Sequence, residues 1–361
     1  MNIFEQRFVK ARRLLAENEI DAVVVTSSPN FFYFSGTWLD SHERLQAIVI
    51  PKTGTPTMIV HEMTKEQVNP PKSVDRLFWK DGDSPIELLA NLLPEKGKVS
   101  IDNQWPSGNL IQLMSLLPLS FVGSDNILGA LRLKKDNLEL KYLKDSALCA
   151  DQIMDSVSKL LKPGITEKEV VREIESLFKQ KGVDQLSFDA IVAAGSNAAV
   201  PHHHPDDTVL KEGDSVVIDM GGIKEHYCSD ITRTFIIGEP SREFKEVYSV
   251  VQKAQDEAVK AIKPGVPMKD IDQVARNIID KAGYGSYFTH RTGHGIGMEV
   301  HEEPYLAPTN SRLLEEGMVV SVEPGIYLPG KFGVRIEDIV VVTSEGAERL
   351  NNYPRELIRV G

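Results

Sequence analysis

Residues 214–235 read DSVVIDMGGIKEHYCSDITRTF, and this stretch decides how the second half of the chain folds. Its pattern predicts two apolar strands, Ser215 to Met220 and Asp230 to Ile236, joined by a glycine-containing turn. Asp219 lies at the end of the first strand and Asp230 begins the second. Two carboxylates would then lie close together where burial without a compensating charge is costly. The pattern indicates a cation site, and it fits equally well two aspartates that only cap turns.

The composition is that of an ordinary globular protein, with 41% hydrophobic and 26% charged residues. A length of 361 residues favours two domains. The net charge of -11, without a concentrated run of Lys and Arg, argues against a nucleic-acid partner. Cys149 and Cys228 are too few for a disulfide framework, and no apolar run has membrane-spanning length. We therefore expect a cytoplasmic protein without a membrane partner. The amphipathic, mixed-charge start MNIFEQRFVKARRLL is typical of neither a signal peptide nor a transit peptide.

The first part of the chain alternates strand and helix patterns. Asn2 and Glu5 have the spacing of a capping box, and the helix that follows would present one apolar face, made of Phe4, Phe8, Ala11 and Leu15. Strand patterns lie at 22–26, 45–50, 57–60, 99–102 and near Phe121, with a helix at 107–117 before the last of them. This alternation predicts an α/β domain over residues 1–128, followed by a second domain over residues 129–361.

The second domain repeats its own pattern. KPG occurs at 162–164 and again 101 residues later at 263–265, each time after a long predicted helix. LKEG at 210–213 is matched 104 residues later by LEEG at 314–317. Helices are predicted from the capping-box pairs Asp136/Glu139 and Thr166/Glu169, at 244–262, and in a segment ending near Gly283. Two similar halves would stack with pseudo-twofold symmetry around a central cleft.

The repeat also pairs four acids and adds one histidine. Asp219 corresponds to Glu323, and each is followed, after a glycine-containing turn, by a second acid. The histidine lies in THRTGHGIG at 289–297, which is not a phosphate loop because no Lys-Ser/Thr follows the glycines. Alone, such a histidine would more often be structural. Together these residues supply four carboxylates and one imidazole, a set suited to Mn, Co, Fe or Zn: Asp219, Asp230, His294, Glu323 and Glu337.

Four acids are too many for one divalent ion and suit two ions that share bridging carboxylates. Two metals roughly 3.5–4 Å apart hold a hydroxide between them and lower the pKa of bound water toward about 7. We therefore expect two divalent metal ions, with Mn or Co as first choices and Zn or Fe as alternatives, and a hydrolytic reaction.

The chain resembles the pita-bread metallopeptidases, and within them the Xaa-Pro dipeptidase (prolidase) and aminopeptidase P branch. The resemblance covers essentially all of residues 135–361, through VVIDMGGIKEHYCSDITRTF, HRTGHGIG, GMVVSVEPGIY and GVRIEDIV. The N-terminal segment is similar to the creatinase-like domain of that branch. The implied fold class is an α/β creatinase-like N-terminal domain followed by an α+β pita-bread catalytic domain with an internal pseudo-twofold repeat.

The resemblance also implies a role for each site residue. Asp219 would bind one metal, His294 and Glu323 the other, and Asp230 and Glu337 would bridge them. Glu323 would be the general base and later the proton donor. His202 and His301 match the two histidines of the family that are not ligands and would hold the scissile carbonyl. Arg335 matches an arginine that would orient Glu337. We interpret His203 and His204 as solvated loop residues, Cys228 as a packing residue, and give His290 little weight.

The implied activity is cleavage of the peptide bond before proline in Xaa-Pro dipeptides, by an enzyme expected to be a homodimer. The alternative is aminopeptidase P, which acts on longer Xaa-Pro peptides. A more distant alternative is a non-enzymatic binding protein on the same fold. Methionine aminopeptidase is disfavoured because of the large N-terminal domain, and creatinase because all five ligands are intact.

A dipeptidase must read a free C-terminal carboxylate, most simply with an arginine. Some prolidases carry an arginine four positions after the second active-site histidine, where this chain has Tyr305. Arg291, Arg312 or an Arg44 from a neighbouring subunit are the candidates that could replace it.

Overall fold

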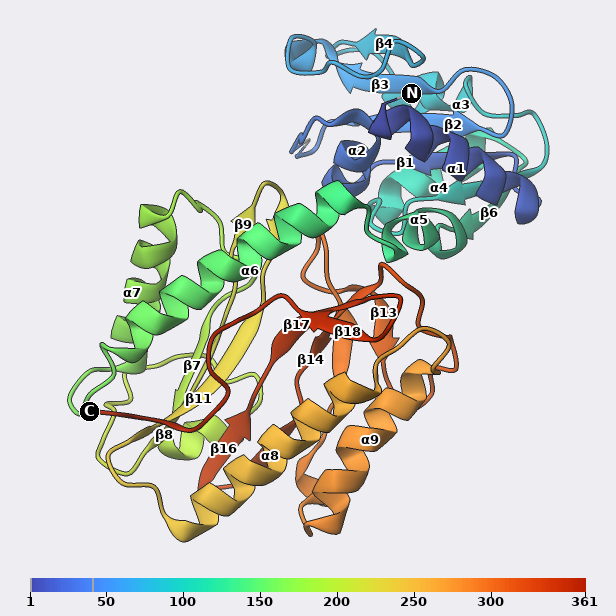
Figure 1. The fold of residues 1–361 in the computed structure, drawn as a ribbon. Coiled ribbons are helices and arrows are strands. Elements are labelled where there is room, and N and C mark those ends of the chain that lie inside the picture. The colour runs from blue at the N-terminus through green and yellow to red at the C-terminus, as the bar shows by residue number, and fades with distance from the viewer. Residues whose placement is uncertain (1, 41) are drawn as a thin grey trace. The chain divides into compact units, whose positions relative to one another are not determined.

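The structure, a computed structural model, describes residues 2–40 and 42–361 (Figure 1). Contacts between residues divide the chain into two units after Arg132, whereas the sequence pattern placed the boundary after residue 128. In the described part of the chain, no helix combines the length and the apolar character needed to cross a membrane. Cys149 and Cys228 are buried, and within the described residues they form no disulfide.

The first unit is built on one mixed six-stranded sheet in the order β4-β3-β2-β1-β5-β6. The strands are β1 (Ala22–Val25), β2 (Ala47–Pro51), β3 (Thr57–His61), β4 (Asp75–Trp79), β5 (Lys98–Ile101) and β6 (Ser120–Gly123). The helices are α1 (Ile3–Glu17), α2 (Ser28–Ser35), α3 (Pro85–Ala90), α4 (Ser107–Leu116) and α5 (Ala130–Leu133). The capping box predicted from Asn2 and Glu5 is present and begins α1.

The sequence analysis missed four of these helices and strands, namely α2, β4, α3 and the short helix α5. The sequence of α2 is SPNFFYFS, which is apolar nearly all round and so has no helical face pattern. β4 reads DRLFW, and its first two residues are exposed at the edge of the sheet, so it lacks the apolar run of its neighbours. α3 is only six residues long, too short for a periodicity to be recognised.

The second unit carries two pairs of helices and two main sheets. The helices are α6 (Asn137–Ser158), α7 (Glu167–Gln180), α8 (Arg242–Ala261) and α9 (Met268–Lys281). One sheet has the order β19-β11-β8-β7, with β7 (Ile191–Ala194), β8 (Ser215–Met220), β11 (Ile231–Ile237) and β19 (Ile358–Val360). The other has the order β13-β12-β14-β17-β18, with β12 (Gly293–Gly295), β13 (Glu302–Leu306), β14 (Val319–Val322), β17 (Asp338–Val342) and β18 (Ala347–Arg349). Two hairpins complete the unit, β9 (Ile223–Lys224) with β10 (Tyr227–Cys228) and β15 (Gly325–Leu328) with β16 (Phe332–Arg335).

The internal repeat predicted from KPG and L-x-E-G is present in the hydrogen bonds. The amide of Gly164 donates to the carbonyl of Leu210, and the amide of Gly265 donates in the same way to Leu314. Gly213 and Gly317, which end the two L-x-E-G segments, both have φ +86, a left-handed conformation that favours glycine. The two halves therefore use the same turn chemistry to lead into β8 and β14.

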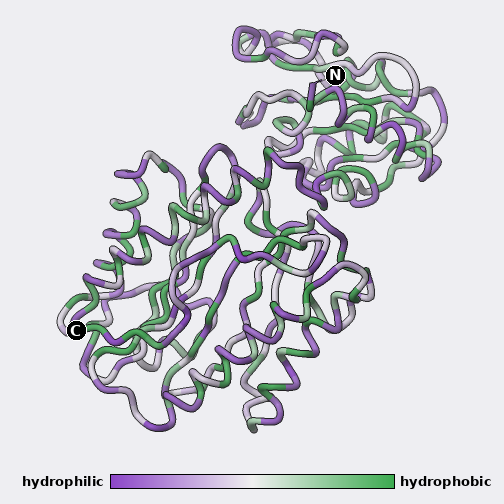
Figure 2. Tube along the Cα trace, in the orientation of Figure 1, coloured by the Kyte–Doolittle hydropathy of each residue, from purple (hydrophilic) through white to green (hydrophobic). Residues whose placement is uncertain are grey.

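Each half has its own hydrophobic core. Side chains of α6 and α7 pack with β7, β8 and β11 in one cluster, and those of α8 and α9 pack with β14 and β17 in the other. β8, β11, β14 and β17 consist mostly of hydrophobic residues, and Figure 2 shows hydrophilic and hydrophobic residues alternating along the helices. This is the pattern of amphipathic helices that cover one face of a sheet and leave the other face free for a site.

Arg233 connects the two halves of the second unit through its side chain. Its side chain is buried and pairs with Asp338 of β17 at 2.7 Å. It also donates to the backbone carbonyls of Thr232, Glu337, Tyr353 and Pro354. Because the carbonyl of Glu337 is among these acceptors, the contact fixes the backbone next to a predicted metal ligand.

Candidate metal centre

All eight residues singled out by the sequence line one cavity of about 670 Å³ in the second unit. These residues are Asp219, Asp230, His294, Glu323, Glu337, His202, His301 and Arg335. The two halves of the repeat both contribute to this cavity, as the pairing of acids predicts.

Strand ends place the five predicted ligands. Asp219 lies one residue before the end of β8, and Asp230 immediately precedes β11. Glu323 immediately follows β14, and Glu337 immediately precedes β17. His294 occupies the centre of β12. Each acid therefore lies at or beside a strand terminus, and the flanking strands hold its backbone in place.

Two glycines allow the strands to approach so closely. A Cβ at Gly221 would lie 1.8 Å from the carbonyl oxygen of Ser229, next to Asp230. A Cβ at Gly293 would lie 1.9 Å from the carbonyl oxygen of Ser321, in the strand that leads to Glu323. The glycines of the DMGG and TGHG stretches are therefore required for packing next to the acids.

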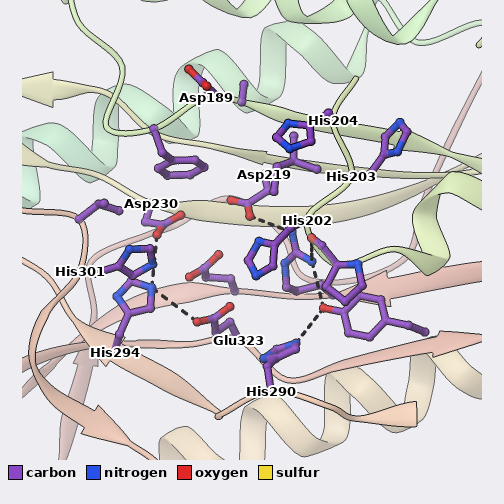
Figure 3. Close-up of a pocket in the computed structure, with 18 of the residues that line it drawn as sticks. Asp189, His202, His203, His204, Asp219, Asp230, His290, His294, His301 and Glu323 are labelled. Carbon is purple, nitrogen blue, oxygen red and sulfur yellow. Dashed lines mark hydrogen bonds and ion pairs between the residues drawn. The ribbon is translucent and has the colours of Figure 1, made fainter. Parts of the chain in front are cut away.

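His294 faces the acids with one nitrogen. Its Nδ1 donates to the carbonyl of Gly295 at 3.1 Å, which leaves a lone pair on Nε2. Nε2 lies 3.6 Å from Oδ2 of Asp230 and 3.5 Å from Oε1 of Glu323, as Figure 3 shows. Burial lowers the pKa of this imidazole to about 3, so the ring is neutral. A neutral imidazole held by a backbone carbonyl has the form in which histidine binds a metal.

The carboxylates carry unused oxygen atoms. Within residues 2–40 and 42–361, buried Oδ1 of Asp219, Oδ1 of Asp230 and Oε1 of Glu337 have no hydrogen-bond partner. Potential ligand atoms of Asp230, His294 and Glu337 lie within 4.8 Å of one another. A buried oxygen without a hydrogen-bond partner raises the free energy of the folded state. A divalent cation bound by these oxygens would remove that cost, so the donor set fits divalent cations.

The pKa shifts of the buried carboxyl groups also indicate a site for a cation. Burial and then the neighbouring carboxylates raise the pKa of Asp230 and of Glu337 well above their usual values. Burial also raises the pKa of Glu323 to about 7, although Arg335 opposes the shift. Without an added positive charge, the three carboxyl groups cannot all be ionised at neutral pH without a large electrostatic penalty. A cation among them would remove that penalty.

Arg335 interacts with two of the predicted ligands, one directly and one through a hydroxyl group. Its guanidinium forms an ion pair with Asp219 at 2.8 Å, rather than with Glu337. Nε donates to the hydroxyl of Thr232 at 3.1 Å, and that hydroxyl donates to Oε2 of Glu337 at 2.7 Å. Thr232 therefore stands between Arg335 and Glu337 and connects them through two hydrogen bonds. The role of Arg335 in orienting Glu337 stays a prediction. Arg335 ends β16 and Glu337 precedes β17, and the sequence alone could not show which acid would lie nearer to the guanidinium.

Tyr327 is a cavity residue that the sequence analysis missed. Its buried hydroxyl accepts a hydrogen bond from Nη1 of Arg335 at 2.9 Å and lies 2.9 Å from Nε2 of His290. Nδ1 of His290 lies 2.7 Å from the carbonyl of Arg291, to which it must donate, so Nε2 accepts from Tyr327. Burial lowers the pKa of His290 to about 4, in agreement with a neutral ring. A continuous chain of hydrogen bonds thus connects His290 to Asp219.

We predict that Tyr327→Phe lowers the free energy of unfolding by about 1–3 kcal/mol, because it leaves buried polar partners without their hydrogen bond. Urea unfolding of the full chain measures the change. Tyr287→Phe is the matched control, since Tyr287 is exposed, and it should leave the unfolding midpoint nearly unchanged. Equal stability of the two variants would contradict a structural role for the Tyr327 hydroxyl.

The histidines that are not predicted ligands occupy the cavity wall. The rings of His301 and His294 meet edge to face, with centroids 4.3 Å apart. His202 is exposed in the wall of the cavity, and Figure 3 places it near Asp219. Both side chains are therefore accessible to a molecule bound next to the acids.

His203 is not the solvated residue that was expected. Its Nε2 lies 2.8 Å from Oε2 of the fully buried Glu167. The same carboxylate accepts hydrogen bonds from the amides of Ala194 and Asp206 and from the side chain of Asn197. Glu167, His203 and Asp206 also form a compact acidic cluster, but these amide donors occupy the carboxylate that a metal would need. Glu167 therefore anchors the segment that carries His202.

A cavity with carboxylates, a neutral imidazole and accessible histidines offers the ligand types that metal-dependent hydrolases use. Residues 141–344 match metallopeptidase family M24, and residues 7–134 match the Creatinase/Prolidase N-terminal domain. The chain belongs to metallopeptidase family M24 and is a metallopeptidase of the pita-bread fold, with the creatinase-type N-terminal domain that the sequence predicted.

Similar proteins cover nearly the whole chain. An uncharacterized peptidase of Staphylococcus aureus strain MSSA476 is 42% identical over 347 residues, which are 94% of this chain and 97% of that protein. The crystal structure of a recombinant prolidase from Thermococcus sibiricus is 37% identical, with a TM-score of 0.92 and 100% of both chains covered. The X-Pro aminopeptidase of Thermotoga maritima MSB8 is 34% identical, with a TM-score of 0.85, covering 98% of this chain and 99% of that chain. These neighbours place the chain in the prolidase branch.

Proposed function

We propose that this protein is a dinuclear-metal hydrolase that cleaves the peptide bond before proline, and that its substrates are Xaa-Pro dipeptides. The observation that carries the proposal is the set of unpartnered buried carboxylate oxygens beside the lone pair of His294, in a cavity open to a ligand. The ligands in this proposal are Asp219, Asp230, His294, Glu323 and Glu337. Mn or Co are the metals proposed first, and Zn or Fe the alternatives.

The metal pair would supply Lewis acidity, which lowers the pKa of water toward about 7 and polarises the scissile carbonyl. Glu323 would take a proton from the attacking water and give it to the leaving imino nitrogen of proline. His202 and His301, on the cavity wall, would donate hydrogen bonds to the carbonyl oxygen as negative charge develops on it. Arg335 would hold Asp219, because the guanidinium occupies one oxygen of that carboxylate and leaves the other free.

An imide bond before proline suits this arrangement. Proline has no N–H, so a peptidase that depends on a backbone donor at that position handles it poorly. The chemistry proposed here needs only the carbonyl oxygen and the leaving nitrogen. The homodimer and the cytoplasmic location expected from the sequence remain predictions.

The second candidate function is that of an aminopeptidase P, which the likeness to the Thermotoga maritima enzyme favours. The test measures metal content by elemental analysis together with kcat/KM for Ala-Pro and for Ala-Pro-Ala. We expect close to two metals per chain and a preference for the dipeptide of at least about tenfold. A preference for the tripeptide would assign the enzyme to the aminopeptidase class. Metal-loaded protein that hydrolyses neither peptide would instead support a binding protein on this fold.

A further inference from the structure

The residue after His202 makes a hydrogen bond that is shielded from water. Nε2 of this residue, His203, lies 2.8 Å from Oε2 of Glu167. The side chain of Glu167 is fully buried, and that of His203 is 12% exposed. Glu167 is the first residue of α7, where the N-terminal end of the helix favours a negative charge. Glu167 and His203 therefore form a charge-assisted contact, the glutamate–histidine pair, directly beside His202.

The residue after His301 makes a corresponding contact. Oε1 of this residue, Glu302, pairs with Nζ of Lys135 at 2.8 Å. The Lys135 side chain is 1% exposed and the Glu302 side chain 9% exposed. A Cβ at Gly297 would lie 2.5 Å from Oε1 of Glu302, so the carboxylate also packs against the backbone. Lys135 and Glu302 therefore form a second buried contact, the lysine–glutamate pair, directly beside His301.

The internal repeat makes the two pairs equivalent. His202 follows Phe188 at the same separation as His301 follows Tyr287. The residues directly after the two histidines therefore occupy the same position of the repeat. One is an imidazole that faces a carboxylate, and the other is a carboxylate that faces an ammonium group. A buried contact at the same place in both halves, made by different side chains, indicates that the contact serves the adjacent histidine.

The backbone on the other side of His202 is held as well. Nη1 of Arg335 donates to the carbonyl of Pro201 at 3.3 Å, and this arginine is buried. His202 therefore lies between two residues, Pro201 and His203, that buried side chains hold in place. The side chain of His202 is itself exposed in the cavity wall. A fixed backbone limits the volume that such a side chain can sample, so it determines where the imidazole can meet a substrate.

We propose that the glutamate–histidine pair positions the imidazole of His202, and the lysine–glutamate pair that of His301, for contact with the scissile carbonyl group. The proposal rests on the proposed function, since both pairs act through histidines of the same reaction. In this role neither pair binds the substrate. Each pair limits the movement of a donor that must meet the negative charge developing on the carbonyl oxygen. A small displacement of such a donor lowers kcat more than it weakens substrate binding.

The first test compares His203→Phe and His203→Gln with the wild type, by kcat and KM for Ala-Pro and Ala-Pro-Ala in excess Mn²⁺. His203→Phe keeps an aromatic ring but loses the hydrogen bond to Glu167, so kcat should fall about 10–100-fold with little change in KM. His203→Gln should recover part of the loss, because its amide can donate to the same carboxylate. His204→Phe is the control, since His204 is exposed, and its kcat should match that of the wild type.

The second test applies Glu302→Gln to the lysine–glutamate pair. Glutamine is nearly isosteric with glutamate but removes the charge that faces Lys135, so kcat should fall about 10-fold with little change in KM. Glu345→Gln is the control, since Glu345 is exposed. Metal content and the urea unfolding midpoint, measured for every variant, show whether the metal and the fold are retained. Glu302→Gln keeps the proposal testable if His203→Phe does not fold.

The third test repeats the substitutions in two backgrounds, His202→Ala and His301→Ala. The effect of His203→Phe on kcat should disappear in the His202→Ala background and remain in the His301→Ala background. The effect of Glu302→Gln should show the opposite dependence. A merely structural role would instead lower kcat by the same factor in both backgrounds, because general damage to the fold does not depend on which histidine is present.

The outcomes separate this inference from the proposed function. Equal effects in both backgrounds, or wild-type kcat in His203→Phe and Glu302→Gln, would refute the positioning role and leave the hydrolase assignment intact. If the metal-loaded wild type hydrolyses neither Ala-Pro nor Ala-Pro-Ala, the proposed function itself fails, and the positioning role fails with it.

Discussion

Glu323→Gln is expected to lose nearly all hydrolysis of Xaa-Pro substrates while the protein stays folded. Removing a general acid–base group lowers kcat by about 10²–10⁴-fold, and loss of a ligand charge would add to this. Glutamine is nearly isosteric with glutamate, so the substitution removes the proton acceptor with little change in packing. The measurement is steady-state kcat for Ala-Pro in the presence of excess Mn²⁺.

The surroundings of Glu323 are the reason for choosing it over the other acids. Its Oε1 lies 3.5 Å from Nε2 of His294, and the hydroxyl of Ser321 lies 3.4 Å away. Asp230 and Glu337 are almost fully buried, whereas Glu323 retains some exposure to the cavity. Asp219 is also partly exposed, but it is paired with Arg335, so Glu323 is the carboxylate best placed to exchange a proton with a bound water.

A control variant and a metal analysis test whether the loss of turnover is specific to Glu323. Glu348→Gln removes an exposed carboxylate that pairs with Lys144, and its turnover should match that of the wild type. Metal content, measured in parallel, distinguishes loss of proton transfer from loss of a metal ion. Glu323→Gln that binds both metals and turns over normally would remove Glu323 from its proposed role.

The sequence predicted the helix pairs, the equivalent turns and the positions of the acids in the second unit because its pattern is duplicated. KPG and L-x-E-G mark turns whose glycines adopt left-handed conformations. Such turns can be predicted from the sequence because glycine favours this conformation. Once the two halves are aligned, Asp219 and Glu323 must lie at equivalent strand ends. That placement required no knowledge of side-chain packing, and the structure brings these acids into one cavity.

Partner choice between distant residues could not be predicted in this way. The pairing of Arg335 with Asp219 joins residues 116 positions apart, and the contact of His203 with Glu167 joins residues 36 positions apart. Tyr327 carried no signal, since a tyrosine in a strand usually packs in a core. These contacts depend on how the two sheets meet, which the hydrophobic pattern does not encode.

Removing the metal is expected to abolish hydrolysis and also to lower the thermal stability of the second unit. A ligand that binds the folded state at about 100 times its Kd adds roughly 2.7 kcal/mol, or about 5–10 °C in Tm for a unit of this size. Differential scanning calorimetry with EDTA, and then with added Mn²⁺ or Co²⁺, measures both the loss and its recovery. Mg²⁺-free buffer with an inert salt at equal ionic strength is the control.

The metal-free protein should in addition show a pH dependence that the metal-loaded protein lacks. The folded-state pKa of Glu323 is raised to about 7 from 4.5, and those of Asp230 and Glu337 are raised as well. Between these values the folded state binds more protons than the unfolded state, so stability is full below about pH 4.5 and is lost as pH rises through about 7. The chelated protein should therefore melt at a lower temperature at pH 8 than at pH 5.5.

Asp230→Asn provides the decisive comparison, because it removes one charge from the cluster without changing its shape. In EDTA at pH 8 the variant should melt at a higher temperature than the wild type, since fewer buried carboxylates repel one another. In saturating Mn²⁺ the order should reverse, since the variant has lost a proposed bridging ligand. A reversal in the order of the two melting temperatures between EDTA and Mn²⁺ is the result expected if cations stabilise the cluster of acids. A variant that is less stable than the wild type in both conditions would mean that Asp230 is needed for the fold itself, and the assignment of the acid cluster as a metal centre would lose its physical basis.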